Sequence, residues 1–186
     1  MKEIRMFDMN ATDDDMIVEG YAAVFDSVTN LGYINEVIDR RAFDNADMSD
    51  IVMKYNHEDS VLPMARTRGG SLQFEVDDHG LKVRAKLPDT SVNRDIYTLI
   101  KEGILSKMSF AFTVKDEEID YTTDTRRILA FDKIFDVSVV DVPAYESTEV
   151  YARSQEEYEE EKEKYENEKR ELEKEKLLLM LALESK

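Results

Sequence analysis

The stretch RRILAFDKIFDVSVVDV, at residues 126–142, decides the fold. It is long, apolar and rich in β-branched residues, which favours a strand buried within a sheet. The preceding EEIDYTTDT (117–125) has the character of the other arm of a hairpin, and KMSFAFTV (107–114) alternates as a strand does. The sequence therefore predicts a core built on long strands in its second half.

The segments before this core are also mainly strands. IVEGYAAVF (17–25) carries a glycine that indicates a bulge or a close approach, and DIVMKYNH (50–57) alternates before a polar cluster. SLQFEV (71–76) and LKVRAKL (81–87) flank the turn DDHG, which is a strong hairpin signal. Helices are predicted at 40–46 and at 91–104, the second with Ser91 as N-cap and Gly103 at its end. The class is α+β: a β-rich, mainly antiparallel, curled or barrel-like sheet with a few surrounding helices.

The composition changes near Ser154. Residues 155–186 hold 12 acidic and 7 basic side chains and neither Gly nor Pro, which predicts one long charged helix. We expect a globular domain over 1–153 and this C-terminal helix over 154–186. The helix repeats Tyr158, Tyr165, Leu172 and Leu179 every seven residues, but the companion heptad position is polar. A seam for self-association and a solvated helix with an apolar end, LLLMLAL (177–183), are both compatible with this pattern.

The overall charge and the missing cysteines exclude several function classes. The chain has 42 acidic and 25 basic residues, a net charge of −17, which disfavours binding to nucleic acid or to an anionic membrane. The run at 177–183 is too short to span a bilayer. With no cysteine there is no disulfide, thiolate nucleophile or iron–sulfur cluster, and we expect no cofactor.

Three residues are candidates for chemistry. His57 ends an apolar strand in KYNHEDS, whereas His79, the other histidine, lies in a turn. Ser109 lies with Ala111 and Thr113 on one face of its strand, either as an accessible nucleophile or as a packing residue. Asp136 interrupts an apolar strand on the same face as Ser138, and a buried carboxylate needs a partner, such as Arg126 or Arg127. Taken singly, these residues decide nothing.

Together, and in this order, the motifs resemble the prohead maturation proteases of tailed bacteriophages, serine peptidases whose fold is similar to that of the herpesvirus protease assemblin. The resemblance runs over most of residues 3–153. It rests on six stretches, GYAAVF (20–25), INEVIDRRAF (34–43), NHE (56–58), HGLKVRAKLP (79–88), EGILSKMSFAF (102–112) and DVSVVDVPAY (136–145).

This resemblance implies a role for each candidate. His57 would be the general base, Ser109 the nucleophile and Asp136 the acid that orients the histidine, as such chemistry requires. A backbone amide near 143–145 is the oxyanion donor expected by analogy. The chain departs from the family at Ala111, where glycine is common, and at LPMART (62–67), which replaces a Leu-Gly-x-Thr pattern.

The implied function is a serine endopeptidase inside the assembling procapsid in the host cytoplasm. Its substrates would be the scaffolding protein or the scaffolding segment of the major capsid protein, and the protease itself. The rival hypothesis is a non-enzymatic assembly protein on the same fold. A metal-dependent hydrolase using His57, Glu58 and Asp59 is disfavoured, because adjacent residues on an extended chain point in opposite directions.

Overall fold

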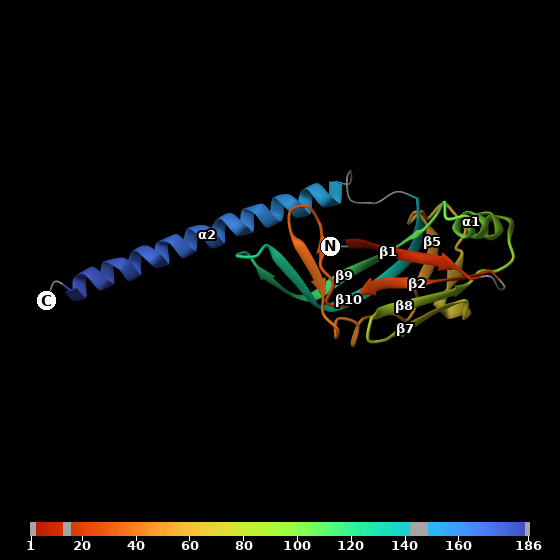
Figure 1. The fold of residues 1–186 in the computed structure, drawn as a ribbon, viewed down its shortest axis with the longest axis horizontal. Helices are drawn as coiled ribbons and strands as arrows, with labels where there is room; N and C mark the ends of the chain where they lie inside the picture. The colour runs from red at the N-terminus through yellow and green to blue at the C-terminus, as the bar shows by residue number, and fades with distance from the viewer. Residues whose placement is uncertain (1–2, 13–15, 142–148, 185–186) are drawn as a thin grey trace.

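The computed structural model describes residues 3–12, 16–141 and 149–184, and it is an α+β fold with one large sheet and a long C-terminal helix (Figure 1). The two α-helices are α1 (Ser91–Lys101) and α2 (Glu149–Glu184), and a short 3₁₀ helix covers Thr67–Gly69. The ten strands of the sheet are β1 (Glu3–Ala11), β2 (Ile17–Val24), β3 (Thr29–Asn30), β4 (Asn35–Ile38), β5 (Val52–Tyr55), β6 (Ala65–Arg66), β7 (Leu72–Val76), β8 (Gly80–Lys86), β9 (Lys107–Asp120) and β10 (Thr125–Val140).

Strand β10 connects the parts of the sheet, because it pairs with β4, β5 and β9. The strand order is β3-β4-β10-β9-β1-β2-β8-β7, with β5 and β6 branching from β10. Most pairs are antiparallel, as predicted, but β4 and β5 both run parallel to β10, so the sheet is mixed. Within the described residues the sheet stays open, with β3 and β7 at its ends, rather than closing into a barrel. Because β10 is 16 residues long, β4 pairs with its first part and β5 with its last.

Two glycines allow backbones to approach closely, as the sequence indicated for the first of them. A Cβ atom on Gly20 would collide with the carbonyl oxygen of Asp8 on β1. A Cβ atom on Gly80 would overlap with the carbonyl oxygen of Ala23 on β2. Gly80 also closes the predicted β7–β8 turn, where Asp77 Oδ1 accepts from the amides of His79 and Gly80. Side chains at these positions would therefore push neighbouring strands apart.

Two local expectations were wrong. Residues 40–46 form consecutive turns rather than a helix. Only alternate amides, those of Ala42, Asp44 and Ala46, bond to the carbonyl three residues back, and Asp47 then pairs with Lys133 of β10. Helix α1 is capped by Thr90 instead of Ser91: its hydroxyl accepts from the Asn93 amide at 3.2 Å. Both residue types cap well, so sequence alone does not choose between them. Gly103, with φ of 72°, follows the helix as predicted.

The core lies on the face of β9 and β10 that carries the large apolar side chains. Phe110, Phe112 and Phe131 are fully buried and pack ring against ring, with centroids 4.7 to 5.8 Å apart. Phe43, from the turns at 40–46, joins them at 4.6 Å from Phe131. The opposite face of the same strands carries the small and polar residues, and it is the face on which the candidate site lies.

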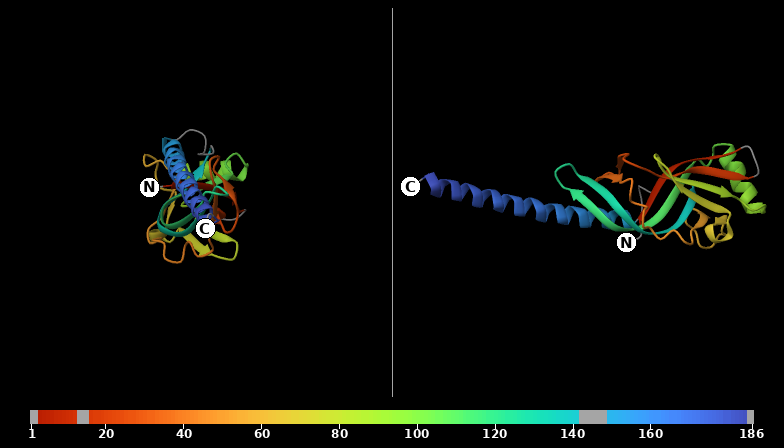
Figure 2. Two further views of the ribbon diagram at one scale, coloured as in Figure 1. Left: turned by 90° about the vertical axis from the view of Figure 1, so that its left-hand side faces the viewer. Right: turned by 90° about the horizontal axis from the view of Figure 1, so that it is seen from below.

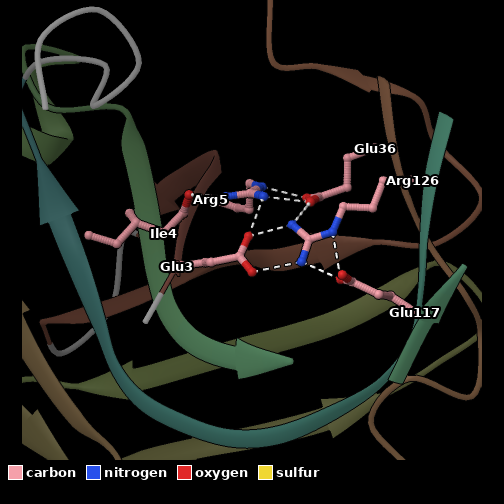
Figure 3. A network of polar contacts seen from close by, with 6 residues as sticks. All are labelled: Glu3, Ile4, Arg5, Glu36, Glu117 and Arg126. Atoms are coloured by element: carbon pink, nitrogen blue, oxygen red, sulfur yellow. Dashed lines mark hydrogen bonds and ion pairs between the residues drawn. The ribbon is translucent and has the colours of Figure 1, made fainter. Parts of the chain in front are cut away.

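A buried network of charges joins four strands, β1, β4, β9 and β10, near the start of β10 (Figure 3). Arg126 donates to Glu3 and to Glu117, each at 2.7 Å, and to Glu36 at 3.1 Å. Arg5 binds Glu36 and Glu3. Burial alone would raise the pKa of Glu3, but Arg126 and Arg5 outweigh it and lower that pKa below its ordinary value. Burial likewise opposes the charge of Arg126, yet its carboxylate partners raise its pKa.

Removing Arg126 should therefore destabilise the domain strongly. Arg126→Leu leaves two buried carboxylates, Glu3 and Glu36, sharing the single guanidinium group of Arg5. Breaking a buried ion pair in this way costs about 3–5 kcal/mol in the free energy of unfolding. The neighbouring Arg127 is a matched control, because it pairs at the surface with Asp26 and Asp39. Arg127→Leu should cost below ~1 kcal/mol. Denaturant unfolding of both variants tests this, and equal losses would contradict it.

The same network makes stability fall in acid. A carboxyl whose pKa is lowered by folding adds stability above its unfolded pKa, here 4.5 for Glu3, and that stability is lost as the pH falls through the lower folded pKa. The unfolding free energy measured from pH 7 to pH 3 should drop more steeply for the natural chain than for Glu3→Gln. Parallel curves would show that Glu3 contributes no such linkage.

Among the side chains of helix α2 that the structure describes, those between Tyr158 and Tyr165 contact the domain, and the later part of the helix projects away as a rod (Figure 2). Tyr158 is buried with Leu31 and Ile34, and its hydroxyl donates to Asp124 at 2.6 Å. Burial and this bond raise the pKa of Tyr158, while Lys162, 2.6 Å from Asp124, and Tyr158 lower the pKa of that carboxyl. Tyr165 stacks on Tyr121 of the β9–β10 turn. Of the predicted heptad series, the two tyrosines thus face the domain, whereas Leu172 and Leu179 are exposed.

Candidate active site

His57 stands on a tight turn directly after β5. Asn56 and His57 both have left-handed backbones, with φ of 49° and 59°, which side chains with a Cβ disfavour. Asparagine tolerates this conformation better than most residues. The turn is fastened to the end of β10 because the Asn56 amide donates to the Val139 carbonyl at 2.9 Å, and Asn56 Oδ1 accepts from the Asp141 amide at 3.1 Å.

Strands β9 and β10 bring the other candidates together. Ser109 pairs across the two strands with Ser138, and Ala111 pairs with Asp136. The predicted strand faces are confirmed. The side chains of Ser109, Asp136 and Ser138 meet on the face opposite the phenylalanine core. Strand β5 pairs in parallel with β10, with Lys54 opposite Ser138 and Tyr55 opposite Val139. This pairing positions His57, which follows β5, beside Ser109 and Asp136.

The three predicted residues form one hydrogen-bonded chain. His57 Nδ1 contacts Asp136 Oδ1 at very short range, and His57 Nε2 lies 3.0 Å from Ser109 Oγ. An ionised carboxylate only accepts hydrogen bonds, so the Nδ1 atom carries the proton and the lone pair of Nε2 faces the serine. This is the tautomer in which an imidazole can take a proton from the Ser109 hydroxyl.

Asp136 contacts His57, the partner that the family resemblance implied. Arg126 and Arg127 bind other carboxylates, so the alternative in which one of them pairs with Asp136 is wrong. Beside His57, Asp136 Oδ1 accepts from Ser138 Oγ at 3.2 Å, and Oδ2 lies 3.9 Å from the ammonium group of Lys54. Lys54 also binds the exposed Asp59 at 2.6 Å. These contacts supply the hydrogen bonds and the nearby cation that burial of a charged carboxylate demands.

The face of small residues is filled rather than open. Ser109 and Ala111 are both 0% exposed, and Asp136 is 1% exposed, while 15% of the His57 side chain remains accessible. The imidazole, with Nε2 at 3.0 Å from Ser109 Oγ, covers part of this face. Low exposure of the carboxylate strengthens its interaction with the imidazole, because little water screens it.

The remaining candidates lie outside this cluster. His79 is in the β7–β8 turn against the ring of Tyr21, with centroids 4.5 Å apart. Asp141 accepts from the Tyr55 hydroxyl at 3.0 Å. In the part of the chain that the structure describes, no three His, Asp or Glu side chains are grouped as metal ligands would be, and His57 and Asp59 have separate partners. The proposed oxyanion donors at 143–145 lie outside the described residues.

One comparison with known proteins found a match. The sequence model of one family, caudovirus prohead serine protease, matches residues 3–164. The chain belongs to the caudovirus prohead serine protease family. No curated protein and no solved structure matches it, so the expected similarity of the fold to assemblin stays a prediction. None of the described helices of this prohead protease family member is both long enough and apolar enough to cross a membrane.

Sequence reasoning missed two residues that hold the site in place. Ser138 contacts both His57 and Asp136, and Asn56 ties the turn to β10. Parity had put Ser138 on the face of Asp136, which was the available signal. Nothing in the local sequence of Asn56 indicated that β5 would lie beside β10, so its role could not be found that way.

Asp136→Asn should retain the fold and lose most activity, on the order of a thousandfold or more in kcat, because an amide can hold the wrong imidazole tautomer. Asp141→Asn is the matched control five residues along the chain. It should be much milder, since the Asp141 carboxylate accepts from the Tyr55 hydroxyl, whereas it is Asp136 that contacts His57 Nδ1. Peptidase assays on both variants, with circular dichroism to verify folding, test this. Equal losses in folded proteins would remove Asp136 from the site.

Proposed function

We propose that this protein is an active serine endopeptidase of phage procapsid maturation, with Ser109 as nucleophile, His57 as general base and Asp136 as the orienting acid. The observation that carries the proposal is the continuous chain of contacts from Asp136 through His57 to Ser109. Membership of the prohead protease family supports it independently.

The geometry suits acyl transfer. As the Ser109 oxygen attacks the carbonyl carbon of the scissile peptide bond, its proton passes to His57 Nε2, and Asp136 stabilises the imidazolium that forms. When the tetrahedral intermediate collapses, the carbon–nitrogen bond breaks and the imidazolium gives its proton to the leaving amine. Water then attacks the acyl-enzyme with His57 again as base, which releases the new carboxylate and restores Ser109.

The substrates in this proposal are the scaffolding protein or the scaffolding segment of the major capsid protein, and the protease itself, inside the procapsid in the host cytoplasm. The family assignment supports a capsid-related substrate. The rival, an assembly protein without activity, has no need of a histidine whose two ring nitrogens face a carboxylate and a serine hydroxyl.

Helix α2 would have two parts in this function. The contacts of Tyr158, Lys162 and Tyr165 support a protease unit that runs to about residue 165, further than the expected boundary at Ser154, and the family match also extends to 164. The projecting part carries the apolar run 177–183, whose six leucine and methionine side chains are 55–66% exposed. We propose this part for self-association or for docking in the procapsid.

Ser109→Ala should abolish processing because it removes the nucleophilic oxygen. It should leave the fold intact because no other atom of the protein is removed. Triad removals cost several orders of magnitude in rate. Co-expression with the capsid protein of the same phage, followed by gel electrophoresis, shows whether the scaffolding segment is cleaved. Ser106→Ala, three residues earlier and exposed, is the control and should process normally. Normal processing by the Ser109→Ala protein would contradict the proposal.

Two shortened chains separate the parts of α2. A chain ending at Asn167 should keep the stability of the full protein and lose self-association, which light scattering measures. A chain ending at Ser154 also loses Tyr158, exposes Leu31 and Ile34, and should be destabilised by about 2–4 kcal/mol. Unchanged association of the chain ending at Asn167 would show that the projecting part has another role.

A further inference from the structure

Ser138 is a fully buried hydroxyl at the back of the candidate site, directly across the strand pair from Ser109. Its Oγ atom lies 3.2 Å from each of three groups: the backbone nitrogen of His57, the Nδ1 atom of the same residue, and Oδ1 of Asp136. One small side chain therefore contacts the two residues that must act on Ser109.

The hydrogen-bonding capacity of the Ser138 hydroxyl determines which group donates and which accepts in each of its three contacts. A serine hydroxyl has one proton to donate and two lone pairs that accept. The backbone N–H of His57 can only donate, so it uses one lone pair. The carboxylate of Asp136 can only accept, so it receives the proton. The second lone pair faces the N–H at Nδ1, which also points to Asp136. All three positions are used, and the hydroxyl has no proton left for the imidazole.

This assignment distinguishes the two serines. Ser109 faces Nε2, the ring nitrogen with a free lone pair, while Ser138 faces Nδ1, which already carries a proton. His57 therefore cannot act as base toward Ser138 in this arrangement.

We propose that Ser138 is a positioning residue for the peptidase reaction, an inference that rests on the proposed function. It holds the backbone of His57 in its disfavoured left-handed conformation and fixes the rotation of the Asp136 carboxylate, so that Oδ1 faces Nδ1. Without it, the carboxylate can rotate and the turn is held by fewer bonds. A displacement of about 1 Å in such a site costs about 10²-fold in rate.

The experiment measures the reactivity of Ser109 directly in the full chain. A fluorophosphonate forms a bond from its phosphorus to the serine oxygen and releases fluoride, with the serine proton taken by His57. Ser138→Ala should lower the second-order rate constant of this reaction about 10²-fold. It should also shift or broaden the far-downfield proton resonance of His57 Nδ1–H, which reports on the bond to Asp136.

Thr67→Val is the matched control. The Thr67 hydroxyl accepts from the Ile51 amide at 2.8 Å just before β5, as Ser138 accepts from the His57 amide just after it. Thr67→Val should lower thermal stability as a lost structural bond does, yet keep the reaction rate and the resonance. Reaction of Ser138→Ala at the wild-type rate with an unchanged resonance would overturn the inference, and so would an equal loss in Thr67→Val.

Failure of the proposed function looks different. In that case the wild-type chain itself would not react at Ser109, whatever residue stands at 138, and the inference would fall with it. If Ser138→Ala does not fold, hydrogen exchange of the wild-type chain decides. The bond to a buried hydroxyl predicts slow exchange of the His57 amide, whereas exchange as fast as at exposed loop amides would overturn the inference.

Discussion

The parallel pairing of β5 with the end of β10 is the constraint on which the candidate site depends. Ser109 and Asp136 are placed by neighbouring strands of a hairpin, but His57 comes from a segment more than 50 residues away in sequence. A slip of one residue in the β5–β10 register would move His57 by about 3.3 Å along the sheet. Its Nε2 atom would then leave hydrogen-bonding range of Ser109. The bonds that fix Asn56 to Val139 and Asp141 oppose such a slip.

Strand β10 serves two different purposes along its length. Its first part carries Arg126 in the buried network with Glu3 and Glu36, and its last part carries Asp136 and Ser138. Charges buried in this way are costly when unpaired, so an alternative register of β1, β4 and β10 would leave them without partners. The network thus disfavours wrong strand pairings at one end of the sheet, and the site is assembled at the other.

Much of this fold could be predicted from short-range patterns. Alternation in 107–114 correctly separated Phe110 and Phe112 from Ser109, and the same rule correctly put Asp136 and Ser138 on one face. The DDHG turn and the close approach at Gly20 were predicted from local steric rules. What failed depends on long-range contacts. The parallel strands on β10 and the turns at 40–46 follow from segments far apart in the chain. The contact of Asp136 with His57 also joins distant segments, and it was expected only from the family resemblance. The roles of the three site residues came from a family resemblance, since each residue alone had an ordinary structural explanation.

The most direct test of the central claim, that Asp136 and His57 activate Ser109, is to locate the covalent adduct that the full chain forms with a fluorophosphonate. After digestion, tandem mass spectrometry identifies the residue that carries the phosphonyl group. The account predicts a single adduct on Ser109, which is lost in His57→Ala and retained in His79→Ala. An adduct on a different residue, or equal modification of Ser109 in the His57→Ala protein, would contradict it.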